Sequence, residues 1–592
     1  MQRCELVDVA AGRVPADLLI RGGRLVNVHT AEIYRADVTV KGDRIAAVGE
    51  VGAGAVGPKT VLVEADGHYL TPGLIETHQH VAGSHLSMTE FARVVLAHGT
   101  TAMATDFYEI AAVGGVKAVR WCLDELRATP LKVMFVIPMP AFYQNEKFGH
   151  TGSLDFKDMV EMLHWPECYG LNEAFASRVL AGDAEMLELV RLTRELGKTV
   201  VGHASEFTGE RLQAWLAAVG STNDHECISA EEALEKARLG IRILLREGSA
   251  ASDVVRVSRA ITGLGADPRM FAFCTDEEEP LRLGRVGHLD EKIRLAVSAG
   301  VNPVTAVQMA TLNGAETYGV SREMGSVTPG KLADILLVKD LRTFEVSTVI
   351  ASGKVVASEG HYTGDLRRPT HPDFARGTVR LKAPARPSDF RVAAPDGVDR
   401  ARVRVIVCVD GDLVTTEREA VLPCRDGEVL ADVRQDVAKI AVLERHHASG
   451  KIGVGFIHGF GLKRGALGST FNPHTEDLAV VGTNDRDLAV AANRVAELGG
   501  GFVAVADGKV VGELPLPLFG LLSDLPVEEV YPRLDRLYAS VRELGCQLRG
   551  PFTSLGFMCL PTIIGNLKIC CEGVVDVWKE QLVDIVSGVN GS

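Results

Sequence analysis

Two histidines at the end of a short apolar run are the first residues in this sequence that could do chemistry. The run Leu70–His80 contains a Pro-Gly turn and ends with His78 and His80, one residue apart. Because side chains alternate along a β-strand, both imidazoles would point to the same side. At the carboxyl end of a strand they could ligate one metal ion. A lone His-x-His pair is more often a polar strand end, so the interpretation depends on partners elsewhere.

Further ligand-type residues stand at the ends of later predicted strands. Glu173 ends the fourth strand, His203 the fifth, His225 the sixth and Asp276 the eighth. Four imidazoles and two carboxylates suit two divalent ions, with Glu173 placed to bridge them, and are compatible with zinc, manganese or iron(II). A metal lowers the pKa of bound water to roughly 7, which makes it a nucleophile at neutral pH. Asp276 could then pass the proton to a leaving group.

The stretches between these residues alternate between strand and helix patterns. About eight such alternations predict an α/β fold with a (β/α)8 TIM-like barrel, whose active site lies at the carboxyl ends of the strands. An open doubly wound sheet is the alternative, but no GxGxxG motif follows a strand and opens a helix. Strands are expected at 100–105, 131–137, 169–173, 199–203, 222–225, 241–245 and 270–276, and helices at 90–97, 116–127, 183–197, 229–238, 289–299 and 303–313.

The flanks of the barrel predict further domains. Short strands separated by Gly-rich turns occur on both sides of the barrel and should pair into one small β-domain. A proline-rich stretch then reads as a linker before a second α/β unit, in which helical patterns occur at 431–445, 486–498 and 527–545. His446 and His447 are expected on a solvated helix end. The predicted parts are a small β-domain (1–70 and 320–360), the barrel (71–319), a linker (361–400) and a C-terminal α/β domain (401–592).

Composition sets the class of the protein. The chain has 592 residues, 46% of them hydrophobic and 24% charged, as in globular proteins with large cores. The formal net charge of −14 argues against nucleic acid and anionic membranes as main partners. The 11 cysteines form no CxxC pair, so a reduced, cytoplasmic location is expected. We also expect no signal peptide and no transmembrane helix.

Longer motifs repeat the pattern of a known enzyme family. They include Gly202-His203-Ala204, Asn223-Asp224-His225-Glu226, Cys274-Thr275-Asp276, Gly287-His288-Leu289-Asp290 and, in the second unit, Gly459–Gly465. Over nearly its whole length the chain resembles the adenine deaminase family of the amidohydrolase superfamily. The resemblance implies a metal-dependent hydrolase of C–N bonds other than peptide bonds, with two ions, Mn²⁺ or Fe²⁺ preferred and Zn²⁺ compatible. It would convert adenine to hypoxanthine and ammonia in purine metabolism, through metal-bound hydroxide.

Some motifs depart from the family pattern where the pocket is expected. Asp106-Phe107-Tyr108-Glu109 stands for Asp-Pro-His-Glu, and Asn472–Asp477 stands for Ala-His-Asp-Ser-His-Asn. The metal-ligand set is intact while these residues differ. The substrate could therefore be adenine or a related aminopurine, or the enzyme could open a cyclic amide or another C–N bond of a different heterocycle. A catalytically silent scaffold is a third hypothesis, which the intact ligand types oppose.

Other polar residues at strand ends are candidates for the pocket. We predict Glu109 as a second acid/base group beside Asp276. Asp106 could face the substrate or orient a metal ligand. Arg246, Glu247 and Ser249 follow the seventh strand, where they could contact the substrate or form a salt bridge at the barrel rim. A small heterocyclic substrate is the expected partner, and we expect a homo-oligomer, a dimer or a tetramer.

Overall fold

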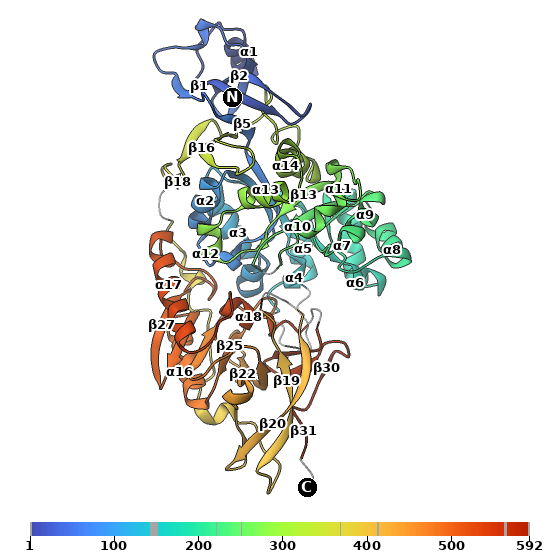
Figure 1. Cartoon of the computed structure of the whole chain (residues 1–592), viewed down its shortest axis with the longest axis vertical. Coiled ribbons are helices and arrows are strands. Elements are labelled where there is room, and N and C mark those ends of the chain that lie inside the picture. The colour runs from blue at the N-terminus through green and yellow to red at the C-terminus, as the bar shows by residue number, and fades with distance from the viewer. Residues whose placement is uncertain are drawn as a thin grey trace.

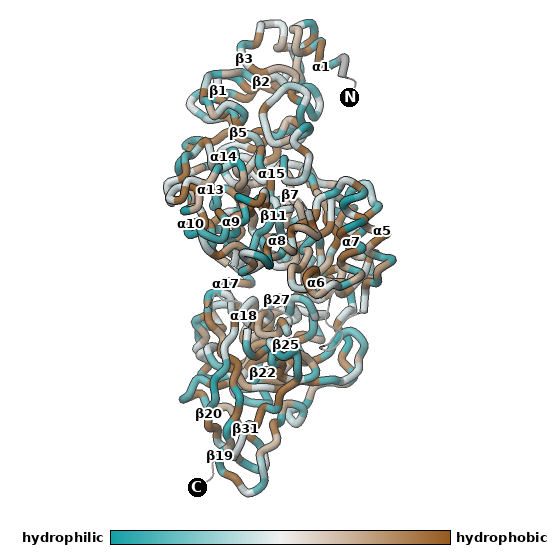
Figure 2. The backbone as a smooth tube through the Cα atoms, turned by 90° about the vertical axis from the view of Figure 1, so that its right-hand side faces the viewer, coloured by the Kyte–Doolittle hydropathy of each residue, from teal (hydrophilic) through white to brown (hydrophobic). Residues whose placement is uncertain are grey.

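Three bodies follow one another along the long axis of the molecule (Figure 1). A small sheet lies at the N-terminal end, a helix-covered barrel lies in the middle, and a sheet-rich domain lies at the C-terminal end. Figure 2, turned by 90°, shows the same order, with the barrel between the other two bodies. The computed structural model describes residues 3–142, 148, 152–220, 222–249, 251–366, 369–410, 414–561 and 565–589.

The barrel is a parallel sheet whose strands follow one another in sequence order. β14 pairs in parallel with β6 and so brings the end of the sheet back to its beginning. This closure confirms the predicted TIM-like α/β fold. The strands are β6 (Leu74–His80), β7 (Thr100–Thr105), β8 (Lys132–Ile137), β9 (Cys168–Phe175), β10 (Thr199–His203), β11 (Thr222–Asp224), β12 (Arg242–Arg246), β13 (Phe271–Cys274) and β14 (Asp276–Glu277).

Helices cover the outside of the barrel, largely where the sequence predicts them. The helix expected from residue 116 already begins at Tyr108, because Gly115, at φ 62°, joins two helical pieces across a kink. Among the described residues, no helix is both long and apolar enough to cross a membrane. The main helices are α2 (Met88–Ala97), α3 (Tyr108–Arg127), α5 (Phe156–Leu163), α7 (Ala184–Glu195), α8 (Gly209–Val219), α9 (Ala230–Arg238), α13 (Leu289–Ser298), α14 (Pro303–Ala310) and α15 (Leu312–Thr317).

The small sheet draws its strands from both sides of the barrel. β5 (Tyr69–Pro72) lies in the middle, parallel to β1 and antiparallel to β15. It leads directly into β6, so the sheet fixes where the first barrel strand starts. The remaining elements are α1 (Arg3–Ala10), β1 (Leu18–Asn27), β2 (Glu32–Lys41), β3 (Arg44–Gly49), β4 (Val61–Glu64), β15 (Ile335–Val338), β16 (Val346–Ala351), β17 (Lys354–Ser358) and β18 (His361–Tyr362).

The C-terminal domain is built on a second, mostly antiparallel sheet. In it β22 lies between β23 and β25, and α16 packs on β24, β25 and β26. A small sheet of β28 to β30 packs beside β23. The elements are β19 (Arg400–Val407), β20 (Thr416–Arg425), β21 (Glu428–Val429), β22 (Val437–Leu443), β23 (Ile452–His458), β24 (Ala466–Ser469), β25 (Leu478–Gly482), α16 (Asp485–Glu497), β26 (Gly501–Ala506), β27 (Lys509–Pro515), α17 (Val527–Glu543), α18 (Pro551–Phe557), β28 (Leu567–Cys570), β29 (Gly573–Asp576), β30 (Gln581–Leu582) and β31 (Val586–Val589).

One predicted helix is wrong. The pattern at 431–445 contains the central strand β22, all seven residues of which are buried. A strand buried on both faces has no alternation, so its apolar run cannot be told from a helix by periodicity, whereas its β-branched residues favour a sheet. The one cation in the strand, Lys439, donates to the Phe390 carbonyl at 3.0 Å and to Asp485 at 2.7 Å. The predictions of α16 and α17 are confirmed.

Hydrogen bonds tie the C-terminal domain to the barrel. His85, just beyond β6, accepts at its carbonyl oxygen from the Ser523 amide at 2.9 Å. The Glu90 carboxylate accepts from the Val527 amide at 3.0 Å. Glu279, at the start of α12 (Pro280–Arg285), bonds the hydroxyls of Thr553 and Tyr538 from α18 and α17. The barrel mouth and the C-terminal domain therefore form one continuous packed region.

The Glu279 carboxyl makes the stability of this junction depend on pH. Burial raises its pKa to about 7, although Thr553 and Tyr538 act in the opposite direction. Between the unfolded pKa of about 4.5 and pH 7, the folded protein holds a proton that the unfolded chain releases, so stability falls as pH rises. Glu279→Gln removes this loss. We expect the free energy of unfolding of the variant to equal that of the wild type near pH 4.5. At pH 8 it should be higher by about 2 kcal/mol, allowing for the partial exposure of residue 279.

Urea unfolding at both pH values checks this expectation. Glu543→Gln, on the exposed end of α17, is the matched control and should show no such difference between the two pH values. A Glu279→Gln protein that is less stable than the wild type at pH 8 would contradict the assignment.

Candidate metal centre

The six predicted ligands meet at one mouth of the barrel. Because the strands are parallel, their carboxyl ends lie at the same side of the sheet. His78 and His80 lie in β6, Glu173 lies in β9, His203 ends β10, and His225 follows β11 directly; Asp276 begins β14. All except His203 are buried, and His203 is partly so. The barrel therefore gathers residues that are distant in sequence into one polar cluster.

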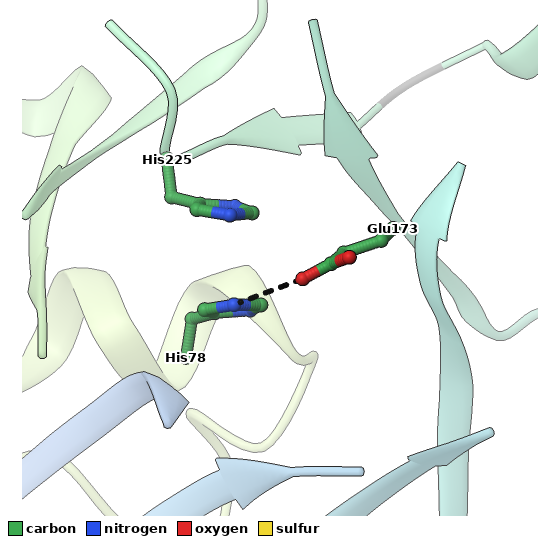
Figure 3. Close-up of side chains that lie close together, drawn as sticks. All are labelled: His78, Glu173 and His225. Atoms are coloured by element: carbon green, nitrogen blue, oxygen red, sulfur yellow. Dashed lines mark ion pairs between the residues drawn. The ribbon is translucent and has the colours of Figure 1, made fainter. Parts of the chain in front are cut away.

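Glu173 lies between the two histidines of β6. Its Oε1 is 3.1 Å from His80 Nε2 and 3.5 Å from His78 Nε2, and the two Nε2 atoms are 3.1 Å apart. Asp276 Oδ1 approaches the same nitrogens, at 3.4 Å from His80 and 3.8 Å from His78. Figure 3 shows Glu173 pointing at His78 beside the His225 ring. Nitrogen and oxygen lone pairs thus converge on one small volume, as they do around a cation.

The other two histidines extend the cluster. The rings of His78 and His225 stack with their centroids 3.9 Å apart, and the rings of His225 and His203 lie 5.5 Å apart. Glu226, which the sequence did not single out, places Oε1 3.4 Å from His225 Nε2 and 3.9 Å from His203 Nε2. Its position directly after His225 could have indicated Glu226 as a site residue, because the side chain of the next residue beyond a strand can also face the barrel mouth.

Within the described part of the chain, four sets of potential ligand atoms lie within 4.8 Å of one another. They share members, which is the arrangement that neighbouring ions with a common ligand require. The donors are imidazole nitrogens and carboxylate oxygens, a combination that zinc, manganese and iron(II) all accept. The residues present therefore fit the metal that the sequence predicts. The sets are His78/Glu173/His225, His78/His80/Asp276, His203/His225/Glu226 and His80/Asp106/Glu109.

Two residues of the cluster are in the charge state that a metal ligand needs. Burial would raise the pKa of the Glu173 carboxyl, but hydrogen bonds from His78 and His80 outweigh it and hold that pKa well below its usual range. Burial, with the charge of His78 behind it, lowers the pKa of His225 well below its usual range. Metal ligands must be an ionised carboxylate or a neutral imidazole, and these two residues are held in those states.

The backbone conformation is strained at Glu173 and Asp276, the two carboxylate residues of the cluster. Glu173 has φ 47° and Asp276 has φ 66°, in the left-handed region that L-residues with side chains rarely adopt. Such a conformation costs about 1–3 kcal/mol and persists only where the surrounding structure determines it. At both positions the strained residue directs its carboxylate toward the histidines.

Asp106 is placed to orient a ligand. Its Oδ1 lies 3.1 Å from His80 Nδ1, and its Oδ2 accepts from Asn172 Nδ2 at 2.7 Å. A proton held on Nδ1 by this carboxylate leaves Nε2 free to face Glu173. Of the two roles predicted for Asp106, the geometry favours orientation of His80 over contact with a substrate.

A buried lysine supports the strand ends on the opposite side. Lys236 Nζ donates to Asp224 Oδ2 and to the Ala204 carbonyl, both at 2.7 Å. Asp224 Oδ1 in turn accepts from the Ala204 amide at 2.9 Å. Because Ala204 follows His203 and Asp224 precedes His225, this network fixes the spacing of those two histidines.

The three candidates after the seventh strand separate into two groups. Arg246 joins the cluster, with Nη1 3.1 Å from Asp276 Oδ2 and in contact with Glu226. Glu247 instead pairs with Arg282 at 3.2 Å, and Ser249 donates to Glu278 at 2.8 Å. Glu247 and Ser249 thus bond to groups of the barrel rim, which is the alternative that the sequence offered for them.

Glu109 lies beside the cluster without a partner. It is fully buried, and neither carboxyl oxygen has a hydrogen bond among the described residues. Burial raises the pKa of its carboxyl well above the usual range, against the nearby charge of His80 and with those of Asp106 and Glu277. Burial therefore favours the protonated form of this carboxyl.

Similarity to known proteins agrees with this geometry. The profile of the amidohydrolase family matches residues 69–356, and that of the adenine deaminase C-terminal domain matches residues 412–581. An adenine deaminase of Moorella thermoacetica is 41% identical over 99% of this chain and 98% of its own. The chain belongs to the adenine deaminase family. Another adenine deaminase, from Ruegeria sp. TM1040, is 38% identical over 99% of this chain and 98% of its own.

Membership of the adenine deaminase family accounts for both halves of the molecule. The amidohydrolase match spans every strand of the barrel and so contains all the clustered side chains. The second match spans the segment Asn472–Asp477, where the sequence departs from the family pattern. Among solved structures, a beta-aspartyl dipeptidase of Fervidobacterium islandicum AW-1 aligns with 59% of this chain and 99% of its own, at 16% identity and a TM-score of 0.45.

The orienting contact of Asp106 can be tested by metal binding. Asp106→Asn keeps the shape and removes the charge that holds the His80 proton, so we expect affinity for Mn²⁺ to fall about 10- to 100-fold. Titration of Mn²⁺ into chelator-treated protein, followed by calorimetry, measures the change. Glu247→Gln, just beyond the barrel strand β12, is the control and should bind Mn²⁺ as the wild type does. Equal affinities of Asp106→Asn and wild type would contradict the orienting role.

Proposed function

We propose that this protein hydrolyses adenine, or a closely related aminopurine, to hypoxanthine or its analogue and ammonia. The observation that carries the proposal is a set of four histidines and two carboxylates, all buried except the partly buried His203, at the barrel mouth of a chain that belongs to the adenine deaminase family. The relatives at about 40% identity match it over nearly their whole length, so both domains of the family are present. Their name does not favour the alternative of a ring-opening amidohydrolase.

We infer that the site holds two divalent ions, Mn²⁺ or Fe²⁺ before Zn²⁺. His78, His80 and Asp276 would hold one, His203 and His225 would hold the other, and Glu173 would serve both. When bound, such ions acidify water and polarise the atom under attack. Glu226, close to both His203 and His225, is a further candidate ligand of the second ion.

Asp276 is our candidate for moving the proton. Arg246 pairs with its Oδ2, which leaves Oδ1 facing His78 and His80. A carboxylate fixed in this way can accept a proton from the attacking water and return it to the departing amine. The strained backbone of Asp276 keeps Oδ1 at this position while the proton moves.

Glu109 is our candidate for the second acid. Burial raises the pKa of its carboxyl well above the usual range and so favours the protonated form. A neutral carboxylic acid next to the cluster can donate to a ring nitrogen of the purine and so favour attack at the adjacent carbon. Asp276 and Glu109 would then divide the work, one as base and the other as acid, because their surroundings differ.

Ammonia release provides the decisive test. Protein grown with Mn²⁺ should release ammonia from adenine, and chelation should abolish the activity until Mn²⁺ is restored. Asp276→Asn should lower kcat by about 10²–10⁴, the usual contribution of a general acid–base group. Glu247→Gln should stay within a few-fold of the wild type. No ammonia from adenine, isoguanine or N6-methyladenine would reject the proposal.

A further inference from the structure

A segment of the C-terminal domain closes over the barrel site. Residues 470–477 connect β24 to β25 and carry His474 at their centre. The His474 ring lies 5.7 Å from the ring of Tyr108, edge to face, and the Tyr108 ring lies 4.7 Å from that of His80. Only one aromatic ring therefore separates the C-terminal domain from a predicted metal ligand. We call residues 472–477 the closing segment.

The closing segment is held in a fixed, strained shape. His474 and Glu476 have φ 76° and 51°, both in the left-handed region. The Thr475 carbonyl lies 2.8 Å from Nε2 of His446. The His446 side chain is only 8% exposed and lies in a bend after β22, not on the solvated helix end predicted for it. Arg445 bonds the Glu476 carbonyl through Nε and Asp477 Oδ1 through its amide, the latter at 3.2 Å. These contacts with His446 and Arg445 stabilise the two strained residues and fix the positions of their side chains.

Several buried polar atoms around this segment have no hydrogen-bond partner among the described residues. From the barrel they are both carboxyl oxygens of Glu109 and Oε2 of Glu277. From the closing segment they are Oε1 of Glu476 and both amide atoms of Asn472. Glu109, Glu476 and Asn472 are 0% exposed and Glu277 is 8% exposed. An unsatisfied buried polar group destabilises a protein by about 1–3 kcal/mol, so these six atoms indicate a ligand that satisfies them.

These groups lie near one another. Burial raises the pKa of Glu476 well above the usual range, and the proximity of the Glu109 and Glu277 carboxyls acts in the same direction. Tyr108 donates its hydroxyl hydrogen to Glu277 Oε1 at 3.3 Å, next to the ring of His474. Unsatisfied polar atoms of both domains therefore lie near the contact between Tyr108 and His474, beside the metal centre.

The chemistry of this lining selects a class of ligand. Carboxyl and amide oxygens accept hydrogen bonds, and the amide nitrogen of Asn472 donates them. A planar heterocycle with N–H groups and ring nitrogens along its edge offers both kinds of partner, as an aminopurine does. A purely apolar ring would leave the same atoms unsatisfied and would be rejected.

We propose that the closing segment forms one wall of the substrate pocket, with Glu476 and Asn472 binding the N–H-bearing edge of an aminopurine opposite Glu109 and Glu277. This inference rests on the proposed function for the identity of the ligand. It assigns the C-terminal domain a direct part in specificity. It also explains why the departures at 106–109 and 472–477 occur together, since the two segments meet where Tyr108 contacts His474.

Substitutions in the closing segment test the proposal. Glu476→Ala and Asn472→Ala should each raise KM for adenine about 10- to 100-fold, as expected for loss of a hydrogen bond to a buried polar group. They should leave the bound metal and the circular dichroism spectrum unchanged. Glu513→Ala is the control in the same domain, because Glu513 pairs with Arg494 on α16 away from the cavity. It should leave KM unchanged.

Binding of 6-methylpurine, which has no amine to lose, separates this inference from the proposed function. Calorimetry should show the same weakening in Glu476→Ala and Asn472→Ala even if no ammonia is released, in which case only the proposed function fails. Wild-type affinity and KM in both variants would overturn the inference alone. A fall in metal content in Glu476→Ala would also overturn it, because the segment would then serve the metal and not the substrate.

Discussion

Ionisable groups kept out of water at the barrel mouth are the constraint on which the rest of the structure depends. Burying a carboxylate such as Glu173 is expensive unless opposite charge and hydrogen bonds replace its water. The parallel barrel makes this possible by bringing histidines from β6, β10 and β11 to one place. Asp106, Lys236 and Arg246 then fix the ligand side chains from behind, and the backbone accepts strain at Glu173 and Asp276.

The C-terminal domain extends the same principle across a domain boundary. His85, Glu90 and Glu279 bind it to the barrel, and its closing segment then reaches the site. A pocket built from two domains can be enclosed more completely than one lined by barrel loops alone. Enclosure lowers the local dielectric constant and strengthens each hydrogen bond made to a ligand. The polar lining contributed by Glu476 and Asn472 is effective for that reason.

The barrel and the predicted ligands could be found from the sequence because each depends on local pattern. The spacing of His78 and His80 at the end of an apolar strand predicts two metal ligands on one side of that strand. The strand–helix alternation predicts a barrel in which the carboxyl ends of the strands meet at one mouth. Glu226 was missed because its role depends on how the chain turns after β11. The contact between Tyr108 and His474 could not be predicted from the sequence, because it depends on how two domains pack against each other. β22 was misread because complete burial removes the periodicity that distinguishes a strand from a helix.

The small sheet at the N-terminal end carries a consequence for biosynthesis. β5 leads straight into the barrel, yet its partner β15 emerges from the ribosome only after the whole barrel has been translated. Until then the nascent chain presents β5 as an open, apolar strand edge, of the kind that recruits other chains. Pairing with β15 ends that exposure. Because β5 precedes the barrel and β15 follows it in the chain, β5 is protected only after the barrel has been completed.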